Sequence, residues 1–207
     1  MNEITAITPQ LKDKRRCNVY VDGRFCCGLT LEATVKNRLK VGQIVTEARL
    51  AEIQLESERE TAFDKALTHL SATRKTERQI RTFLAGKGYL SSVVDYVVKK
   101  LCDYNFLNDG EYAEAYVESA VKRKGGRLIR MELRGKGISD EEIDGALSTL
   151  SEEQETDSAR AILTKYMRGK TADKATLQKA YRYLMGKGYD YETIKPFLAE
   201  FGDCDEE

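Results

Sequence analysis

Two sets of arginines, each spaced at i, i+4 and i+7, are the residues in this sequence best suited to bind a charged partner. The first set is Arg74, Arg78 and Arg81, and the second, 49 residues later, is Arg123, Arg127 and Arg130. At roughly 100° per residue, side chains with this spacing lie within about 60° of one another on a helix, so each set predicts a basic stripe. Such a stripe is either a solvated helix face or a contact surface for an acidic partner. Because it occurs twice, we favour an acidic partner, which could be a nucleic-acid backbone or an acidic protein groove.

Further basic residues extend the second stripe and form another cluster near the N-terminus. Lys124, Arg134 and Lys136 reinforce the stripe, whereas Ile129 and Leu133 lie on the opposite side of the same predicted helix. We therefore expect the stripe to face outward. The secondary basic cluster consists of Lys12, Lys14, Arg15 and Arg16.

A Gly-Lys-Gly tripeptide occurs three times and invites comparison with a phosphate-binding loop. Such loops precede a helix, so that free backbone N–H groups point at the anion. Here the tripeptide follows a helical pattern, and an apolar residue comes directly after it, as in Leu84, Gly88 and Tyr89. That order is typical of a Schellman cap, in which the residue after the glycine contacts the last helical turn. We expect Gly88, Gly137 and Gly188 to be structural caps with positive φ, with anion binding as the less favoured alternative.

Cysteine and histidine residues form no metal-binding or catalytic pattern. The five cysteines are irregularly spaced, Cys26 and Cys27 lack a second pair, and His69 is the only histidine. A zinc site would need a second pair of ligands. A nucleophile elbow and a correctly placed phosphate loop are also absent from the sequence. We expect no metal, no cofactor, no disulfides and no enzymatic activity.

The stripes and caps belong to a repeated three-helix unit. The Gly-Lys-Gly copies lie 49 and 51 residues apart, which predicts three tandem repeats in an elongated all-α array. Expected first helices lie near 60–71, 108–122 and 157–168, second helices near 76–87, 127–136 and 173–187, and third helices near 91–104, 139–150 and 190–201. Capping-box sequences begin at Thr76, Asn108 and Ser139. The acidic run from 151 to 157 is expected to link the second and third repeats. In the third repeat the positions of the stripe hold Lys174, Gln178 and Tyr181, so the stripe is largely absent there.

The N-terminal segment predicts a β-hairpin and a short helix. Asp22-Gly23 separates two β-prone runs, and both positions of such a turn need positive φ. Thr30 is the expected N-cap of the helix that follows. The expected parts are the hairpin and helix at 1–45, repeats at 46–106 and 107–150, and a third repeat with an acidic tail at 151–207.

The bulk composition excludes some classes of protein without identifying one. The chain has 207 residues, with 34 basic and 34 acidic side chains, so net charge favours no partner. A hydrophobic fraction of 41% with only two prolines is typical of a folded, helix-rich protein. No apolar run approaches the roughly 20 residues that span a bilayer, and no signal-peptide pattern is present. We expect a cytoplasmic, monomeric protein that does not bind membranes.

Taken together, the motifs resemble the bacterial RecX regulatory family over most of the chain. The shared segments are the Val19–Gly23 hairpin, Leu107-Asn108-Asp109, Tyr112-Ala113, Tyr116-Val117, Ile129-Arg130 and the run from Glu132 to Ile138. Two departures concern the second repeat. Ala120 stands where the family usually has a basic residue, and the segment 122–128 is slightly short. Both departures bear on the contact geometry of this repeat and leave the resemblance itself intact.

The resemblance implies curved tandem repeats and a role in DNA repair, homologous recombination and the SOS response. A member of this family would bind the RecA recombinase filament, in its groove or at its growing end. It would thereby lower recombinase, ATPase and coprotease activities. The alternative is a helical-repeat module that binds DNA directly, with the arginines on phosphates. Weak contact with single- or double-stranded DNA is compatible with both hypotheses.

Overall fold

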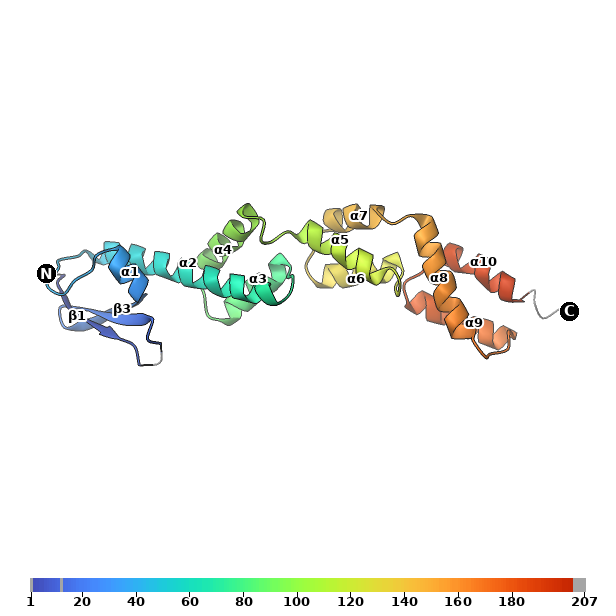
Figure 1. Ribbon diagram of the computed structural model, residues 1–207, viewed down its shortest axis with the longest axis horizontal. Helices are drawn as coiled ribbons and strands as arrows, with labels where there is room; N and C mark the ends of the chain where they lie inside the picture. The colour runs from blue at the N-terminus through green and yellow to red at the C-terminus, as the bar shows by residue number, and fades with distance from the viewer. Residues whose placement is uncertain (1, 12, 203–207) are drawn as a thin grey trace. The chain divides into compact units, whose positions relative to one another are not determined.

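The computed structural model describes residues 2–11 and 13–202, with only the backbone described at 201 and 202 (Figure 1). Within this part of the chain a three-stranded sheet is followed by ten helices. The chain divides into two compact units. The first comprises Met1–Thr73 and Ile80–Phe106, and the second comprises Arg74–Gln79 and Leu107–Glu207.

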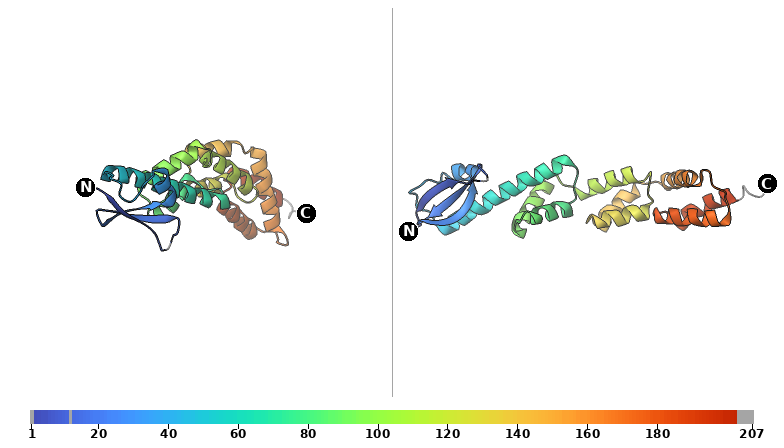
Figure 2. Two further views of the ribbon diagram at one scale, coloured as in Figure 1. Left: turned by 60° about the vertical axis from the view of Figure 1, so that its left-hand side comes forward. Right: turned by 90° about the horizontal axis from the view of Figure 1, so that it is seen from below.

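The sheet at the N-terminus is antiparallel, in the order β1-β2-β3 (Figure 2, right). Its strands are β1 (Ile4–Pro9), β2 (Arg16–Val21) and β3 (Arg24–Thr30). The turn between β2 and β3 has positive φ at Asp22 (47°) and Gly23 (80°), which confirms the predicted hairpin.

Strand β1 was not part of the expected hairpin, and the prediction of a two-stranded element was wrong. The register of β1 shifts between Ile4 and Ala6, where a bulge interrupts its pairing with β2. A bulge breaks the alternation of buried and exposed residues by which a strand is recognised in sequence. Ile4 is nevertheless fully buried, so β1 contributes to the core.

Two helices complete the N-terminal region. Helix α1 (Leu31–Lys36) starts at Thr30, whose side chain accepts a hydrogen bond from Ala33 N at 3.1 Å, as predicted. Helix α2 (Glu47–Ala72) is continuous over 26 residues, so the first helix expected near 60–71 is only its C-terminal part. Its N-terminal half buries Leu50 and Ile53 in one core cluster with the sheet.

The repeat helices follow the predicted order. The first repeat adds α3 (Glu77–Gly86) and α4 (Ser91–Asp103) to the end of α2. The second repeat contains α5 (Asp109–Ala120), α6 (Gly126–Gly135) and α7 (Asp140–Ser148). The third contains α8 (Glu152–Met167), α9 (Lys174–Gly186) and α10 (Tyr191–Gly202). The all-α class with three tandem three-helix repeats and a small N-terminal β-element is confirmed.

The acidic run at 151–157 is not a linker, contrary to prediction. Ser151 is the N-cap of α8 and forms a reciprocal capping box with Gln154. Glu152, Glu153 and Glu155 lie in the first turn of the helix. Carboxylates in a first turn are stabilised by the positive end of the helix dipole, which explains how so acidic a segment begins a helix.

All three Gly-Lys-Gly caps have the predicted Schellman geometry. The φ angles of Gly88, Gly137 and Gly188 are 85°, 90° and 91°. In each cap the N–H of the next residue donates to a carbonyl in the last helical turn, for example Tyr89 N to Leu84 O at 3.3 Å. The tripeptides therefore end helices, as the sequence predicts.

Candidate interaction surface

The helical arginines lie away from the apolar core of their repeats. Ile80 and Leu84 of α3 are fully buried, and so are Ile129 and Leu133 of α6. Arg78 and Arg127 are exposed, at equivalent positions on the two helices. The amphipathic pattern thus places two copies of the stripe on solvent-facing helix surfaces.

Arg74 and Arg123 do not share these helix faces. Helices α3 and α6 begin at Glu77 and Gly126, so both arginines precede the first helical turn. The angular argument for a three-residue stripe therefore holds only for the second and third members of each set. Both residues are exposed, and neither forms an ion pair within the described chain.

The last arginine of each stripe forms an ion pair with the third helix of its own repeat. Arg81 Nη1 lies 2.5 Å from Asp95 Oδ1 on α4. Arg130 Nη1 pairs with Asp144 Oδ1 on α7 in the same way. The arginines and the aspartates are each separated by 49 residues, so one bridge is repeated in both repeats. These side chains therefore help to fix neighbouring helices, besides offering charge to a partner.

Two other basic residues of the second repeat also have acidic neighbours. Arg134 Nε donates to Asp140 Oδ1 at 2.5 Å, and this hydrogen bond holds the pKa of the Asp140 carboxyl below its usual value. Arg127 Nη1 lies 3.6 Å from Asp190 Oδ1 in the third repeat. The surface formed by the stripe arginines and their acidic partners is therefore of mixed charge. We call it the mixed face.

Lys124 belongs to a half-buried hydrogen-bonded cluster. Its Nζ lies 2.6 Å from both carboxylate oxygens of Glu132, and the Tyr116 hydroxyl donates to the same carboxylate at 2.5 Å. Burial alone would raise the pKa of Glu132, but the hydrogen bonds from Lys124 and Tyr116 lower it below 4.5. The ammonium of Lys136 stands 5.5 Å from the centre of the Tyr116 ring. This cluster explains why the motif around Tyr116 and Glu132 combines these residue types.

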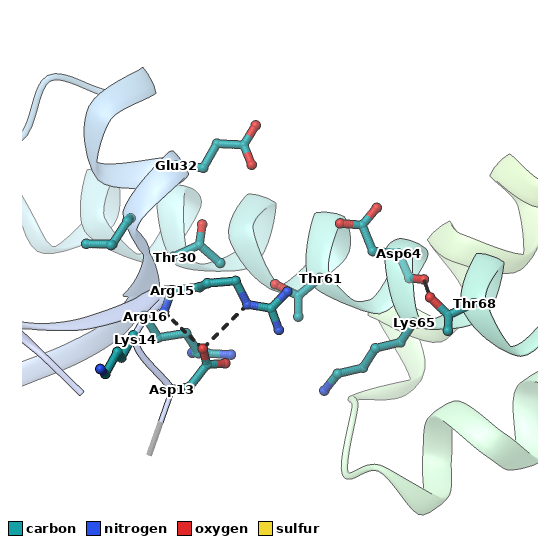
Figure 3. A pocket seen from close by; sticks show the side chains of 11 residues that line it. Asp13, Lys14, Arg15, Arg16, Thr30, Glu32, Thr61, Asp64, Lys65 and Thr68 are labelled. Carbon is teal, nitrogen blue, oxygen red and sulfur yellow. Dashed lines mark hydrogen bonds and ion pairs between the residues drawn. The ribbon is translucent and has the colours of Figure 1, made fainter. Parts of the chain in front are cut away.

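The secondary basic cluster lines a cleft of about 470 Å³ in the first unit (Figure 3). Lys14, Arg15 and Arg16 form one side, and Lys65 of α2 lies on the other. Arg15 and Lys65 extend toward the same space, while Asp13 lies 3.6 Å from Arg15 Nε. Lys12 lies outside the described residues. The cleft thus has cations on both sides. The cluster of Lys14, Arg15 and Arg16 was predicted from the sequence, and Lys65 was not.

Sequence reasoning named the basic residues and missed their acidic partners. Asp95 and Asp144 repeat with the same period of 49 residues as Arg81 and Arg130. Comparing the repeats for acidic as well as basic positions would have found them. Lys65 gave no such signal, because its place beside Arg15 depends on how α2 packs on the sheet.

The described residues provide no cluster of three side chains arranged to bind a metal ion. Among them there is also no helix that is both long enough and apolar enough to cross a membrane.

Comparison with known proteins gives matches along nearly the whole chain. Four family models match in order: the regulatory protein RecX N-terminal domain at residues 2–46, and the first, second and third RecX three-helix domains at 62–101, 108–147 and 152–198. A regulatory protein RecX from Clostridium tetani is 32% identical over 96% of this chain and 94% of its own length. One from Clostridium perfringens is 34% identical over 93% and 92%.

Solved structures agree with these matches. A crystal structure of regulatory protein RecX has a TM-score of 0.72 and 27% identity, covering 95% of this chain and 98% of that one. The structure of RecX from Lactobacillus salivarius, with a TM-score of 0.66 and 24% identity, supports the fold.

Proposed function

Because this chain belongs to the RecX family of regulatory proteins, we propose that it binds the RecA recombinase filament and inhibits its activity. Binding would occupy the filament groove or cap the growing end, and would lower recombinase, ATPase and coprotease activities. On this proposal the protein acts as a cytoplasmic monomer.

The observation that carries the choice of partner is the pairing of stripe arginines on α3 and α6 with exposed aspartates on α4 and α7. Asp95 and Asp144, which pair with the stripe arginines, have side chains that are 63% and 62% exposed. A DNA backbone is uniformly negative, so these aspartates would oppose it. A protein surface that offers both signs of charge would be complementary. The mixed face therefore favours a protein groove over bare DNA.

Arg74 and Arg123 provide the clearest test, since a charge reversal at either position breaks no ion pair within the described chain. In the double variant Arg74→Glu/Arg123→Glu, we expect inhibition of the RecA ATPase on single-stranded DNA to require at least about 10-fold more protein, a cost of about 1.4 kcal/mol. Folding should be unaffected, because substitutions at such exposed sites change stability by less than about 0.5 kcal/mol.

The matched control reverses Lys174 and Lys179, two exposed lysines of α9 in the repeat that lacks the stripe. We expect the control to inhibit nearly as well as the parent. If both double variants inhibit like the parent, the four basic residues tested are only solvated and do not contact the partner. If the control loses more activity than the Arg74 and Arg123 variant, the contact surface lies in the third repeat.

Direct DNA binding remains the competing function and is distinguished by affinity. The measurement compares binding to bare single-stranded DNA with binding to RecA-coated DNA at several salt concentrations. Equal affinity, with a steep decrease as salt rises, would favour the DNA-binding module. A clear preference for the coated form supports the filament regulator.

A further inference from the structure

The Gly-Lys-Gly cap of the second repeat is also the seat of a helix from the preceding repeat. The Thr76 hydroxyl, at the start of α3, donates to the Lys136 carbonyl at 2.8 Å. Two residues later, the Arg78 side chain lies so close to Gly137 that a Cβ on that glycine would collide with it. Thr76 is fully buried in this contact.

The next junction repeats the arrangement at equivalent positions. Gly125, 49 residues after Thr76, donates its N–H to the Lys187 carbonyl at 2.9 Å. Arg127 N then donates to the Gly188 carbonyl at 3.2 Å. A Cβ on Gly188 would collide with Leu128, so this helix also sits directly on the glycine.

A carboxylate completes each junction. Asp109 Oδ1 accepts the N–H of Glu77 at 2.8 Å, and Glu155 Oε1 accepts the N–H of Gly126 at 2.8 Å. Both acids stand four residues before a fully buried alanine of the first helix. They satisfy free N–H groups at the positive end of the incoming helix. We call the lysine and glycine of the cap, together with this acid, the socket. The seated helix start is the plug.

The first repeat has Glu58, Lys87 and Gly88 at the positions that form the two sockets, and Glu58 Oε1 accepts from Gln54 Nε2 at 3.0 Å. We call these three residues the socket of the first repeat. Glu58 stands four residues before Ala62, which is fully buried like its two counterparts. A Cβ built on Gly88 would meet no atom within 4 Å, in contrast to Gly137 and Gly188. Among the described residues of the first unit, no helix sits on this glycine.

The residue beside this socket is unusual for its position. Leu90 is the N-cap of α4 and makes no side-chain capping bond, whereas Ser139 forms a complete capping box at the same position of the second repeat. Leucine is among the poorest N-cap residues. Its side chain is also 67% exposed. An apolar side chain that neither caps its helix nor packs in the core would gain from being covered by a partner.

We propose that the socket of the first repeat binds the N-terminal turn of a helix from a partner protein. Its N-cap would be Thr or Gly, as in the two plugs of this chain, or the chemically similar Ser. In the third repeat, Asp190 stands two residues after the cap glycine and lies near Arg127. The first repeat has Leu90 at the same position. The partner helix would therefore carry an apolar residue where the plugs of this chain carry Arg78 and Arg127. The inference goes beyond the proposed function and does not require that the partner be a recombinase.

A second copy of this chain fits the socket poorly. The plugs at Thr76 and Gly125 are already seated in the second unit and carry arginine two residues later. Helix α9 of the third repeat starts instead at Asp173, whose carboxylate caps its own helix by accepting from Thr176 N at 2.7 Å. That carboxylate would face Glu58 and the Lys87 carbonyl, which are also negative. The charge pattern therefore favours a different protein.

The test uses the full chain and a synthetic helical peptide that reproduces one of its own plugs. The probe is a stapled, N-acetylated peptide of residues 73–87 with Arg78→Leu. We expect the amide signals of Gly88, Tyr89 and Leu90 to shift on titration, with a dissociation constant below about 1 mM. No shift at these residues, or shifts confined to the caps at Gly137 and Gly188, would overturn the proposal.

Two variants separate binding from folding. Leu90→Ser should raise the unfolding midpoint, because serine caps a helix better than leucine. It should nevertheless lower the affinity for the peptide at least about 10-fold. Gly88→Asn should lower the affinity for the peptide to a similar extent, because asparagine tolerates positive φ but its side chain fills the socket. Gly169→Asn is the control, since Gly169 has φ 71° at a cap with open surroundings. If the peptide binds Leu90→Ser and Gly88→Asn as tightly as the parent, the socket is not its site.

Discussion

At the residue scale, the three cap glycines share one backbone conformation and differ in what surrounds them. Their φ angles lie between 85° and 91°. An added Cβ would meet open space at Gly88, the flexible Arg78 side chain at Gly137, and the backbone of Leu128 at Gly188. The cost of positive φ is therefore common to all three, and the steric cost is not.

Alanine substitution should separate these two costs. Gly88→Ala should destabilise the protein by about 1–2 kcal/mol, the usual penalty for a left-handed residue with a Cβ. Gly137→Ala should cost more, and Gly188→Ala most, because overpacking adds about 1–3 kcal/mol where the neighbour cannot move. Urea unfolding of the three variants gives the order. Equal losses at all three positions would mean that the caps do not seat the preceding helices.

At the scale of elements, the Lys124–Glu132–Tyr116 cluster joins α5, α6 and the turn between them. The low pKa of Glu132 means that the folded state binds its proton less readily than the unfolded state does. Its stabilisation is therefore complete above the ordinary value of 4.5 and is lost as pH falls through the folded pKa. Hydrogen bonding to Glu132 also raises the pKa of Lys124, so its contribution is present below 10.5 and lost as pH rises through the folded value.

Glu132→Gln should weaken the cluster while keeping its shape. At neutral pH we expect a loss of about 1–2 kcal/mol, since hydrogen bonds to a charged group become neutral ones. The decrease in stability between about pH 5 and pH 3 should also become smaller. Urea unfolding across this range measures both effects. Glu114→Gln, at an exposed position beyond the first turn of α5, serves as the control and should change the acid profile less than Glu132→Gln does. A parent-like acid profile in Glu132→Gln would show that other carboxylates determine it.

At the scale of the whole molecule, the second and third repeats are coupled by backbone contact at Gly125. This glycine has φ −82° and ψ 165°, which any residue can adopt. A Cβ there would nevertheless lie 2.5 Å from the Gly188 carbonyl oxygen. Neighbouring repeats of a tandem array are stabilised by the interface between them, so this contact should support the third repeat.

Gly125→Ala is expected to cost about 1–3 kcal/mol and to speed amide hydrogen exchange in α8 to α10 more than in α5. Its matched control is the adjacent Gly126→Ala. There the Cβ meets only Glu155 Oε1 at 3.5 Å, and alanine should stabilise the first turn of α6 by about 0.5–1 kcal/mol. If Gly125→Ala matches Gly126→Ala in stability and exchange, the junction contributes little.

The sequence by itself determined the three-helix repeats, their caps and the outward charge of the second helices. Each of these depends on residues within about two turns of one another, where helical period and cap chemistry act directly. The bulged strand β1 and the start of α8 escaped prediction, because in one case local alternation was broken and in the other an acidic run resembled a linker.

Only the tertiary structure decided which charges are paired and what the caps hold. The Thr76–Lys136 bond joins residues 60 positions apart, and the Gly126–Glu155 bond joins residues 29 apart. No local pattern records such partners, because they are selected by how one repeat packs on the next. The sequence could therefore show that a helix is capped at Gly88, while the two occupied junctions at Gly137 and Gly188 come only from the structure.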